Sequence, residues 1–277
     1  MNLRLKTALI VGCAAVTLAV VLSLVASGIW RSEFDQLERT HIQEHVERLE
    51  MSLAEQSDQL LALGYDWATW DTMYAFAANE PNGLLKDLSD DALNGIHLDV
   101  MLILDVNSKV LLARVRKLDG SYQTLGRKEM QGLRLKLLQR LDTKVSQSTW
   151  LELSGQALLV ASRPILKNDA RGPSRGMVVL GRWLQPTILA ELAQAGFSGI
   201  QALPANAFPG GMGRHVHLLS EAQIAGALEV RDGIGKTLRW LEFEGDREIH
   251  AQGLRSVNLL NGVLIGGAIC FTQSPRG

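Results

Sequence analysis

The stretch GYDWATWDTMYAF, from Gly64 to Phe76, decides how the rest of the sequence is interpreted. It places five aromatic residues and two carboxylates in thirteen positions, whereas the whole chain is only 5% aromatic. If the stretch is helical, residues three or four apart share a face, so Asp66, Trp70 and Tyr74 line one side. The stretch therefore predicts a helix with a continuous aromatic stripe into which carboxylates are set.

Two interpretations of this stripe are open. Aromatic side chains at helical spacing most often belong to a core, and each indole N–H could then bond to Asp66 or Asp71. The stripe could instead form a pocket wall, because aromatic faces and a carboxylate suit a small cationic or amphipathic ligand. The residues alone favour the core.

Length and charge limit the classes of protein to consider. A chain of 277 residues is long enough for one large or two small domains. Its 28 basic and 29 acidic residues nearly cancel and form no basic block, so we expect no nucleic-acid partner. Cys13 and Cys270 lie inside apolar runs and are interpreted as small apolar residues, so no disulfide, metal or cofactor is predicted.

An uncharged run of 23 residues, Ala8 to Trp30, predicts a transmembrane helix. At about 1.5 Å per residue it spans roughly 34 Å, enough to cross the hydrocarbon core of a bilayer. Basic residues precede it and acidic residues follow it, so residues 1–7 are expected in the cytoplasm and residues 31–253 outside. A cleavable signal peptide is the alternative, because residues 25–28 are small, but the apolar run is longer than a usual signal core.

The segment from Arg31 to Leu63 is polar with apolar residues at intervals and contains no proline or glycine, which predicts a long helix leaving the membrane. Its apolar residues recur at steps of four, three, four and seven, a spacing typical of a coiled-coil seam: Ile42, Val46, Leu49, Leu53 and Leu60. This spacing predicts a homodimer that pairs through the juxtamembrane helix. The alternative is an amphipathic helix that folds onto its own domain.

Two pairs of histidines invite a metal hypothesis. His41, Glu44 and His45 match the H-x-x-E-H pattern of some zinc peptidases. The pattern lies on a solvated helix face without an evident third ligand, so we expect neither a metal site nor catalysis there. His215 and His217 have strand spacing, and a half-exposed strand is their commoner explanation.

The remaining patterns predict an α+β domain, in which a single antiparallel sheet carries helices on one face. Apolar runs separated by tight turns indicate strands within 99–114, 150–161, 177–182 and 237–243. Helical periodicity is found within 84–93, 127–141 and 186–195. The glycine-rich residues 204–213 are expected to form a loop, and residues 257–272 are either a truncated second membrane segment or an ordinary buried segment.

The motif from Asp66 to Asp71, followed by Tyr74, Phe76 and the turn residues 79–83, resembles the signature of the fourth class of CHASE domains. These are extracellular sensory modules ahead of bacterial cyclases and histidine kinases. A second block, Arg163–Leu166 with residues 172–182, is similar to the later strands of the same family. The resemblance covers about residues 35–200 and implies a PAS-like or Cache-like sheet, a long N-terminal helix and a place between two membrane helices.

The resemblance also implies ligand sensing by the motif residues. The candidate ligand-binding residues are Tyr65, Asp66, Trp67, Trp70, Asp71, Tyr74 and Arg163. The expected protein is a single-pass or two-pass protein of a bacterial inner membrane, with a periplasmic domain that binds a small molecule and relays the event by helix rearrangement. Its expected partners are the lipid bilayer, a second copy of the chain and an unidentified ligand.

No output domain is recognisable in the chain, which has no G-G-D-E-F, E-A-L or kinase motif. We therefore expect a protein that is not itself an enzyme. One alternative is the input half of a truncated cyclic-di-GMP cyclase, phosphodiesterase or histidine kinase. Another is a structural or partner-binding periplasmic protein in which the aromatic stripe is only core.

Overall fold

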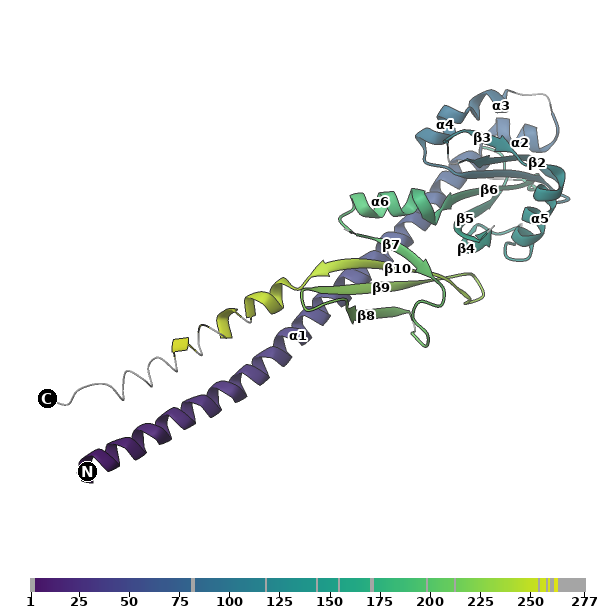
Figure 1. The fold of residues 1–277 in the computed structure, drawn as a ribbon. Coiled ribbons are helices and arrows are strands. Elements are labelled where there is room, and N and C mark those ends of the chain that lie inside the picture. Colours follow the sequence, from purple (N-terminus) through teal and green to yellow (C-terminus); the bar gives the residue numbers. More distant parts are fainter. Residues whose placement is uncertain are drawn as a thin grey trace. The chain divides into compact units, whose positions relative to one another are not determined.

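The computed structural model describes residues 3–80, 83–117, 119–142, 144–153, 155–169, 172–197, 199–211, 213–253, 255–257, 259 and 262–263 (Figure 1). The chain divides into two compact units, each of which is described by itself. One unit contains the chain up to His45, Val216–Gly226 and the chain from Glu244 onward. The other contains Val46–His215 and Ala227–Phe243.

The first element is the helix α1 (Leu3–Ala68), which is 66 residues long and confirms the predicted long N-terminal helix. Among the described residues, it is the helix that is long and apolar enough to cross a membrane, by length and composition, over Val16–Ala68. The assignment of residues 8–30 to the membrane stays a prediction.

A six-stranded antiparallel sheet forms the centre of the second unit and confirms the predicted α+β class. Its strand order is β3-β2-β1-β6-β5-β4. The strands are β1 (Val100–Asp105), β2 (Val110–Arg116), β3 (Tyr122–Thr124), β4 (Gln147–Leu153), β5 (Gln156–Pro164) and β6 (Gly176–Trp183). Both predicted hairpins are therefore present, and Figure 1 shows β5 and β6 side by side.

Helices cover both faces of this sheet, so the expectation of helices on one face is wrong. On one face α5 (Arg127–Leu138) packs Leu133 and Leu137 into a core with Val179 of β6 and Val160 of β5. On the other face lies α1. Its Gly64 is so close to β5 that a Cβ at this position would lie only 3.4 Å from Cγ of Arg163. Residues that alternate along β5 and β6 thus serve two different cores.

A second, four-stranded sheet has the order β7-β10-β9-β8, so the expectation of a single sheet is also wrong. Its strands are β7 (Gln201–Pro204), β8 (Arg214–Leu218), β9 (Gln223–Arg231) and β10 (Thr237–Asp246). Sequence patterns found only β10 and the strand at His215 and His217. The strand β7 is only four residues long, and β9 buries five consecutive residues instead of alternating, so neither shows a clear period of two.

The apolar seam of α1 is buried within the chain itself. Val46, Leu49 and Leu60 have no exposed surface, and Ile42 and Leu53 have little. The alternative of an amphipathic helix folded onto its own domain is therefore confirmed, and pairing of two chains through this seam is wrong. A homodimer as such stays a prediction, which would need another face of α1.

The aromatic stretch is not one continuous helix. The helix α1 ends at Ala68, Trp70 is extended with φ −75° and ψ 133°, and α2 (Asp71–Ala77) begins after it. The backbone N–H of Leu166 donates to the carbonyl of Ala68 at 3.0 Å. In an uninterrupted helix that carbonyl would accept the N–H of residue 72. Here the N–H of Leu166, from the chain after β5, makes this hydrogen bond instead.

Three further helices of the second unit are short, and residues 248–253 of the first unit are also helical. The three short helices are α3 (Leu84–Asp87), α4 (Asp90–Gly95) and α6 (Leu189–Gln194), the last preceded by a kinked turn over Leu184–Ile188. The predicted membrane segment Val257–Thr272 lies mostly outside the described residues.

The burial of the α1 seam predicts a sharp contrast between two neighbouring positions. Leu49→Ala should lower the free energy of unfolding by about 2–5 kcal/mol, because it leaves a cavity at a fully buried site. Met51→Ala, on the exposed side of the same helix, should change it by less than about 0.5 kcal/mol. Denaturant unfolding of the detergent-solubilised chain measures both, and equal losses at the two positions would contradict this packing.

Candidate functional site

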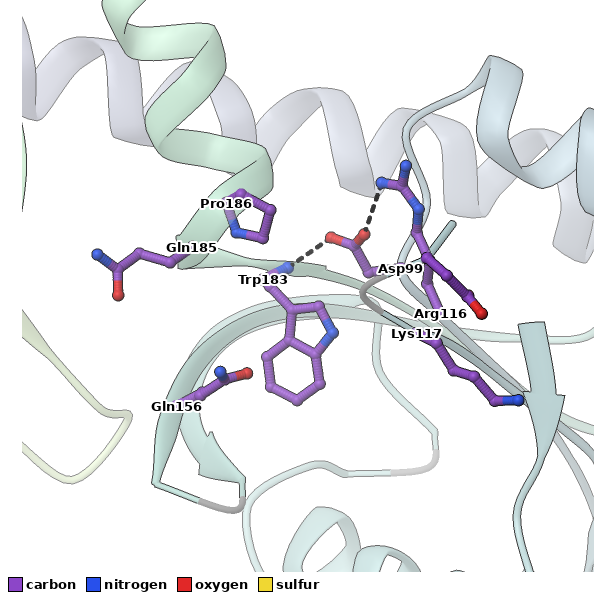
Figure 2. Close-up of a pocket in the computed structure, with 8 residues that line it drawn as sticks. Asp99, Arg116, Lys117, Gln156, Trp183, Gln185 and Pro186 are labelled. Atoms are coloured by element: carbon purple, nitrogen blue, oxygen red, sulfur yellow. Dashed lines mark hydrogen bonds and ion pairs between the residues drawn. The ribbon is translucent and has the colours of Figure 1, made fainter. Parts of the chain in front are cut away.

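A cavity of about 590 Å³ lies at one end of the six-stranded sheet, and we call it the Asp99 pocket. It is lined by charged residues, amides and one indole: Asp99, Arg116, Lys117, Asp119, Gln156, Trp183, Gln185 and Pro186. Figure 2 shows most of these side chains and the interactions of Asp99. Its volume is within the range of small-molecule sites.

The strand register brings these residues together. In an antiparallel sheet the start of one strand lies beside the end of its neighbour. The start of β1 therefore meets the end of β6, where Val100 pairs with Gly181, and the end of β6 meets the start of β5, where Trp183 pairs with Leu158. The backbone N–H of Arg116, the last residue of β2, donates to the carbonyl of Asp99 at 2.7 Å.

Asp99 is a buried carboxylate, with a side chain only 2% exposed. Its Oδ2 accepts the backbone N–H of Trp183 at 2.8 Å, and its Oδ1 accepts Nη1 of Arg116 at 3.3 Å (Figure 2). A buried charge is tolerated only when it is paired and hydrogen-bonded. Asp99 therefore ties the starts and ends of three strands together at the pocket.

The loop between β2 and β3 forms another part of the pocket wall. Its backbone is closed by hydrogen bonds from Lys117 N to Ser121 O and from Gly120 N to Lys117 O. The hydroxyl and backbone N–H of Ser121 both donate to Oδ1 of Asp119, and these bonds hold the pKa of Asp119 below its usual value. Asp119 is thus a carboxylate at neutral pH, next to the ammonium group of Lys117.

Tyr122 fixes the segment that leads into β1. Its hydroxyl donates to the carbonyl of Leu98, directly before Asp99, and the guanidinium of Arg114 lies 5.6 Å from its ring centroid. Burial raises the pKa of Tyr122 to about 12. The phenol is therefore a neutral hydrogen-bond donor at any physiological pH.

Arg182 connects the pocket strand β6 to helices. It precedes the pocket residue Trp183, and its side chain is largely buried. Its guanidinium donates to Oε1 of Gln56 on α1 at 2.9 Å and to the carbonyl of Ile96 at 3.2 Å, and it lies 3.6 Å from the carboxylate of Glu191 on α6. One side chain thus joins the pocket strand to α1 and α6.

The arrangement supplies groups for recognition. In the described part of the chain, no group of three histidine, cysteine or acidic residues is placed to hold a metal ion. The rings of His41 and His45 contact each other at 4.6 Å, and His215 packs against Phe208 at the same distance. The pocket itself offers charges of both signs, two amides and the Trp183 indole, which suit a small polar molecule.

None of the predicted site residues lines the Asp99 pocket. They gather near the opposite ends of β5 and β6, where Pro164 pairs with Met177. The Nε of Arg163 donates to the carbonyl of Leu61, and its guanidinium lies 5.3 Å from the ring centroid of Tyr65. Arg163 thus fastens α1 to the sheet.

The aromatic residues of the motif divide into buried and exposed ones. Trp67 and Tyr74 are buried, whereas Tyr65 and Trp70 are 47% and 40% exposed. The rings of Trp67 and Trp70 are 4.7 Å apart. The predicted continuous stripe is therefore broken where α1 ends.

The polar groups of the motif bind the loop between β5 and β6. The hydroxyl of Tyr74 donates to the carbonyl of Pro173, and the guanidinium of Arg175 lies 4.3 Å from the Tyr74 ring centroid. Asp71 accepts the backbone N–H of Asn168 at 3.3 Å, while Asp66 is exposed. These contacts hold the loop in place, although they do not test whether the motif also binds a ligand.

Sequence reasoning missed the pocket residues, although a signal was present. Asp99, Arg116 and Trp183 each stand at the end of an apolar strand. Polar residues at the ends of strands come close together when those ends are neighbours in the sheet. Which strand ends meet depends on the order β2-β1-β6-β5, which the sequence does not reveal.

The model of the CHASE4 domain family matches residues 52–203, which is more than half of the chain. The chain therefore belongs to the CHASE4 domain family. It is a sensory domain of this family, which confirms the family resemblance seen in the sequence. No protein with a curated description matches the sequence.

Several solved structures resemble the fold at low sequence identity. The ligand-binding domain of the Campylobacter jejuni chemoreceptor Tlp3, in complex with L-valine, is 10% identical with a TM-score of 0.47, covering 80% of this chain and 98% of that one. The Vibrio cholerae LuxQ periplasmic domain is 11% identical with a TM-score of 0.48, covering 75% and 98%. The extracellular domain of the putative histidine kinase vpHK1S-Z8 is 13% identical with a TM-score of 0.45, covering 76% and 95%.

The contacts of the motif predict different effects for its two tryptophans. Trp67→Ala should lower the free energy of unfolding by about 3–5 kcal/mol, because the indole is buried. Trp70→Ala should cost clearly less because Trp70 is 40% exposed, and Asp71→Asn should cost less than about 1 kcal/mol because one exposed hydrogen bond is weakened. Denaturant unfolding compares the three variants, and a larger loss for Trp70→Ala than for Trp67→Ala would contradict this assignment.

Proposed function

We propose that the chain is the input domain of a membrane signalling protein that binds a small carboxylate-bearing molecule in the Asp99 pocket. The observation that carries this proposal is the convergence of charged and aromatic side chains on one cavity at the end of the sheet. Membership of the CHASE4 family supports a sensory role. The candidate residues Tyr65 to Tyr74 then serve mainly to hold the opposite end of the sheet.

The charges of the pocket favour an anionic group on the ligand. The carboxylate of Asp99 is already bonded to Arg116 and to the backbone of Trp183, and Asp119 already accepts two hydrogen bonds from Ser121. The cations that can still receive a ligand are the ammonium of Lys117, which lies beside the Asp119 carboxylate, and the outer side of the Arg116 guanidinium. A carboxylate suits these cations, and the Trp183 indole suits an adjoining apolar part of the ligand.

A thermal-shift screen of the full chain in lipid nanodiscs tests the pocket. A carboxylate or amino acid at about one hundred times its dissociation constant should raise the melting temperature by about 5–10 °C, since it binds only the folded state. Lys117→Gln should abolish most of this shift, whereas Asp71→Asn, at the opposite end of the sheet, should keep it. A shift that disappears with Asp71→Asn and survives Lys117→Gln would place the ligand at the aromatic motif instead.

We also propose that ligand binding is relayed to α1 through Arg182. The residue lies next to Trp183 in the pocket strand and bonds directly to Gln56 on the long helix. A ligand that changes the position of the β6 end therefore changes the packing of α1, as a shift between two populated arrangements. The family resemblance, with its paired membrane helices, supports this direction of signalling.

Removing the bond between Arg182 and α1 should separate binding from relay. Gln56→Leu should leave the ligand affinity within about threefold of the original, because Gln56 does not line the pocket. It should abolish the ligand-dependent change in hydrogen exchange along α1. Gln59→Leu is the matched control, since Gln59 lies on the same helix and its side chain donates to Oε1 of Glu55, also on that helix. An unchanged exchange response in Gln56→Leu would contradict this route.

We further propose a homodimer through the exposed side of α1, in a protein whose own chain is non-catalytic. Its support is a second heptad-like series of exposed positions: Leu37, His41, Glu44, Arg48 and Met51. Such a dimer would pass a helix rearrangement across the inner membrane to a cyclic-di-GMP enzyme or histidine kinase output. The membrane anchor expected over residues 8–30 fits this arrangement.

A further inference from the structure

The turn between β8 and β9 presents two adjacent leucines to the solvent. Leu218 and Leu219 are 46% and 42% exposed, and the residues up to Gln223 are exposed as well. The backbone N–H groups of Leu219 and Ser220 both donate to the carbonyl of Gln223. Exposed apolar side chains that lie together on a protein surface indicate a site of interaction. We call it the Leu218–Ala222 turn.

Arg247 holds this turn against α1 within the first unit. Its backbone N–H donates to the carbonyl of Ala222 at 2.9 Å, and its Nη1 donates to the carbonyl of Glu221. Its Nε donates to Oε2 of Glu38 at 2.6 Å, and its Nη2 donates to Asp35. Because Arg247 and Glu38 are almost fully buried, their pairing fixes the turn beside this part of the helix.

The same contacts give the height of the turn above the membrane. Asp35 and Glu38 follow Trp30, the last residue of the uncharged run, by five and eight positions. At a rise of 1.5 Å per residue, this separation is about 8–12 Å along the helix. The headgroup layer extends about 5–8 Å beyond the hydrocarbon core on each side, so a leucine side chain pointing toward the membrane bridges the difference.

The chain that follows β10 shows which way the membrane lies. Nε2 of His250 is 3.5 Å from Oδ1 of Asp35, and a Cβ on Gly253 would overlap the ring of Phe34. The segment from Arg247 to Gly253 therefore runs back along α1 toward Trp30. The ends of β8 and β10 that adjoin this segment face the same way.

We propose that the Leu218–Ala222 turn rests on the lipid headgroup surface of the membrane that anchors the protein, with Leu218 and Leu219 as the contacts. The proposal rests on the proposed membrane segment over residues 8–30, of which it is a continuation. The turn carries one acidic residue, Glu221, and no basic one, so the contact is apolar and not electrostatic.

Fluorescence quenching by lipids with a headgroup spin label tests this contact in the full chain. The two cysteines are replaced by alanine, and single cysteines introduced by Leu219→Cys and Ile234→Cys are labelled in nanodiscs. Ile234 is the matched control because it is an apolar side chain, 73% exposed, in the turn at the other end of β9, about 30 Å along that nine-residue strand. Quenching at position 219 should exceed that at 234 by about threefold or more, and should persist at high salt.

Two results would overturn the proposal, and they are distinguishable. Equal quenching at 219 and 234, together with strong quenching of a label introduced by Trp30→Cys, would remove the turn from the membrane and leave the anchor intact. No quenching at position 30 would remove the anchor as well. A second label, introduced by Glu221→Cys in the same turn, should be quenched like position 219 and guards against a local effect of replacing Leu219.

Discussion

The burial of one apolar face of α1 inside the chain's own domain is the constraint on which the rest of the structure depends. The helix that leaves the predicted membrane segment is the same helix that packs against the six-stranded sheet. Each fully buried leucine contributes about 1.5–3 kcal/mol, so the burial of Leu49 and Leu60 holds this helix firmly in its own domain. Anything that displaces the sheet along α1 therefore acts on the helix that contains the predicted membrane segment.

Buried charges decide where the strands end. Asp99, Arg182 and Arg247 are each almost fully buried, and each bonds to backbone groups as well as to a side chain of opposite charge or an amide. A buried charge that loses its partner costs several kcal/mol, so these contacts are geometrically demanding. Asp99 lines the cavity at one end of the first sheet, and in the first unit Arg247 joins the returning chain to α1.

The strands β5 and β6 connect two regions with different roles. At one pair of ends, Trp183 and Gln156 line the Asp99 pocket. At the other pair, the motif around Tyr74 binds the connecting loop through Pro173 and Arg175. The motif that identifies the family thus organises the fold, whereas the side chains that suit ligand binding lie at the far ends of the same strands.

The sequence by itself determined the long helix, the hairpins of the first sheet, the α+β class and the CHASE4 family, because periodicity and turn residues are local signals. The tertiary structure alone decided that the seam from Ile42 to Leu60 is core, that the aromatic stretch breaks after Ala68 and that a second sheet exists. It also decided the pocket, since Asp99, Arg116 and Trp183 are far apart in the chain and meet only through the strand order. Burial and convergence are relations between distant segments, and a local pattern does not contain them.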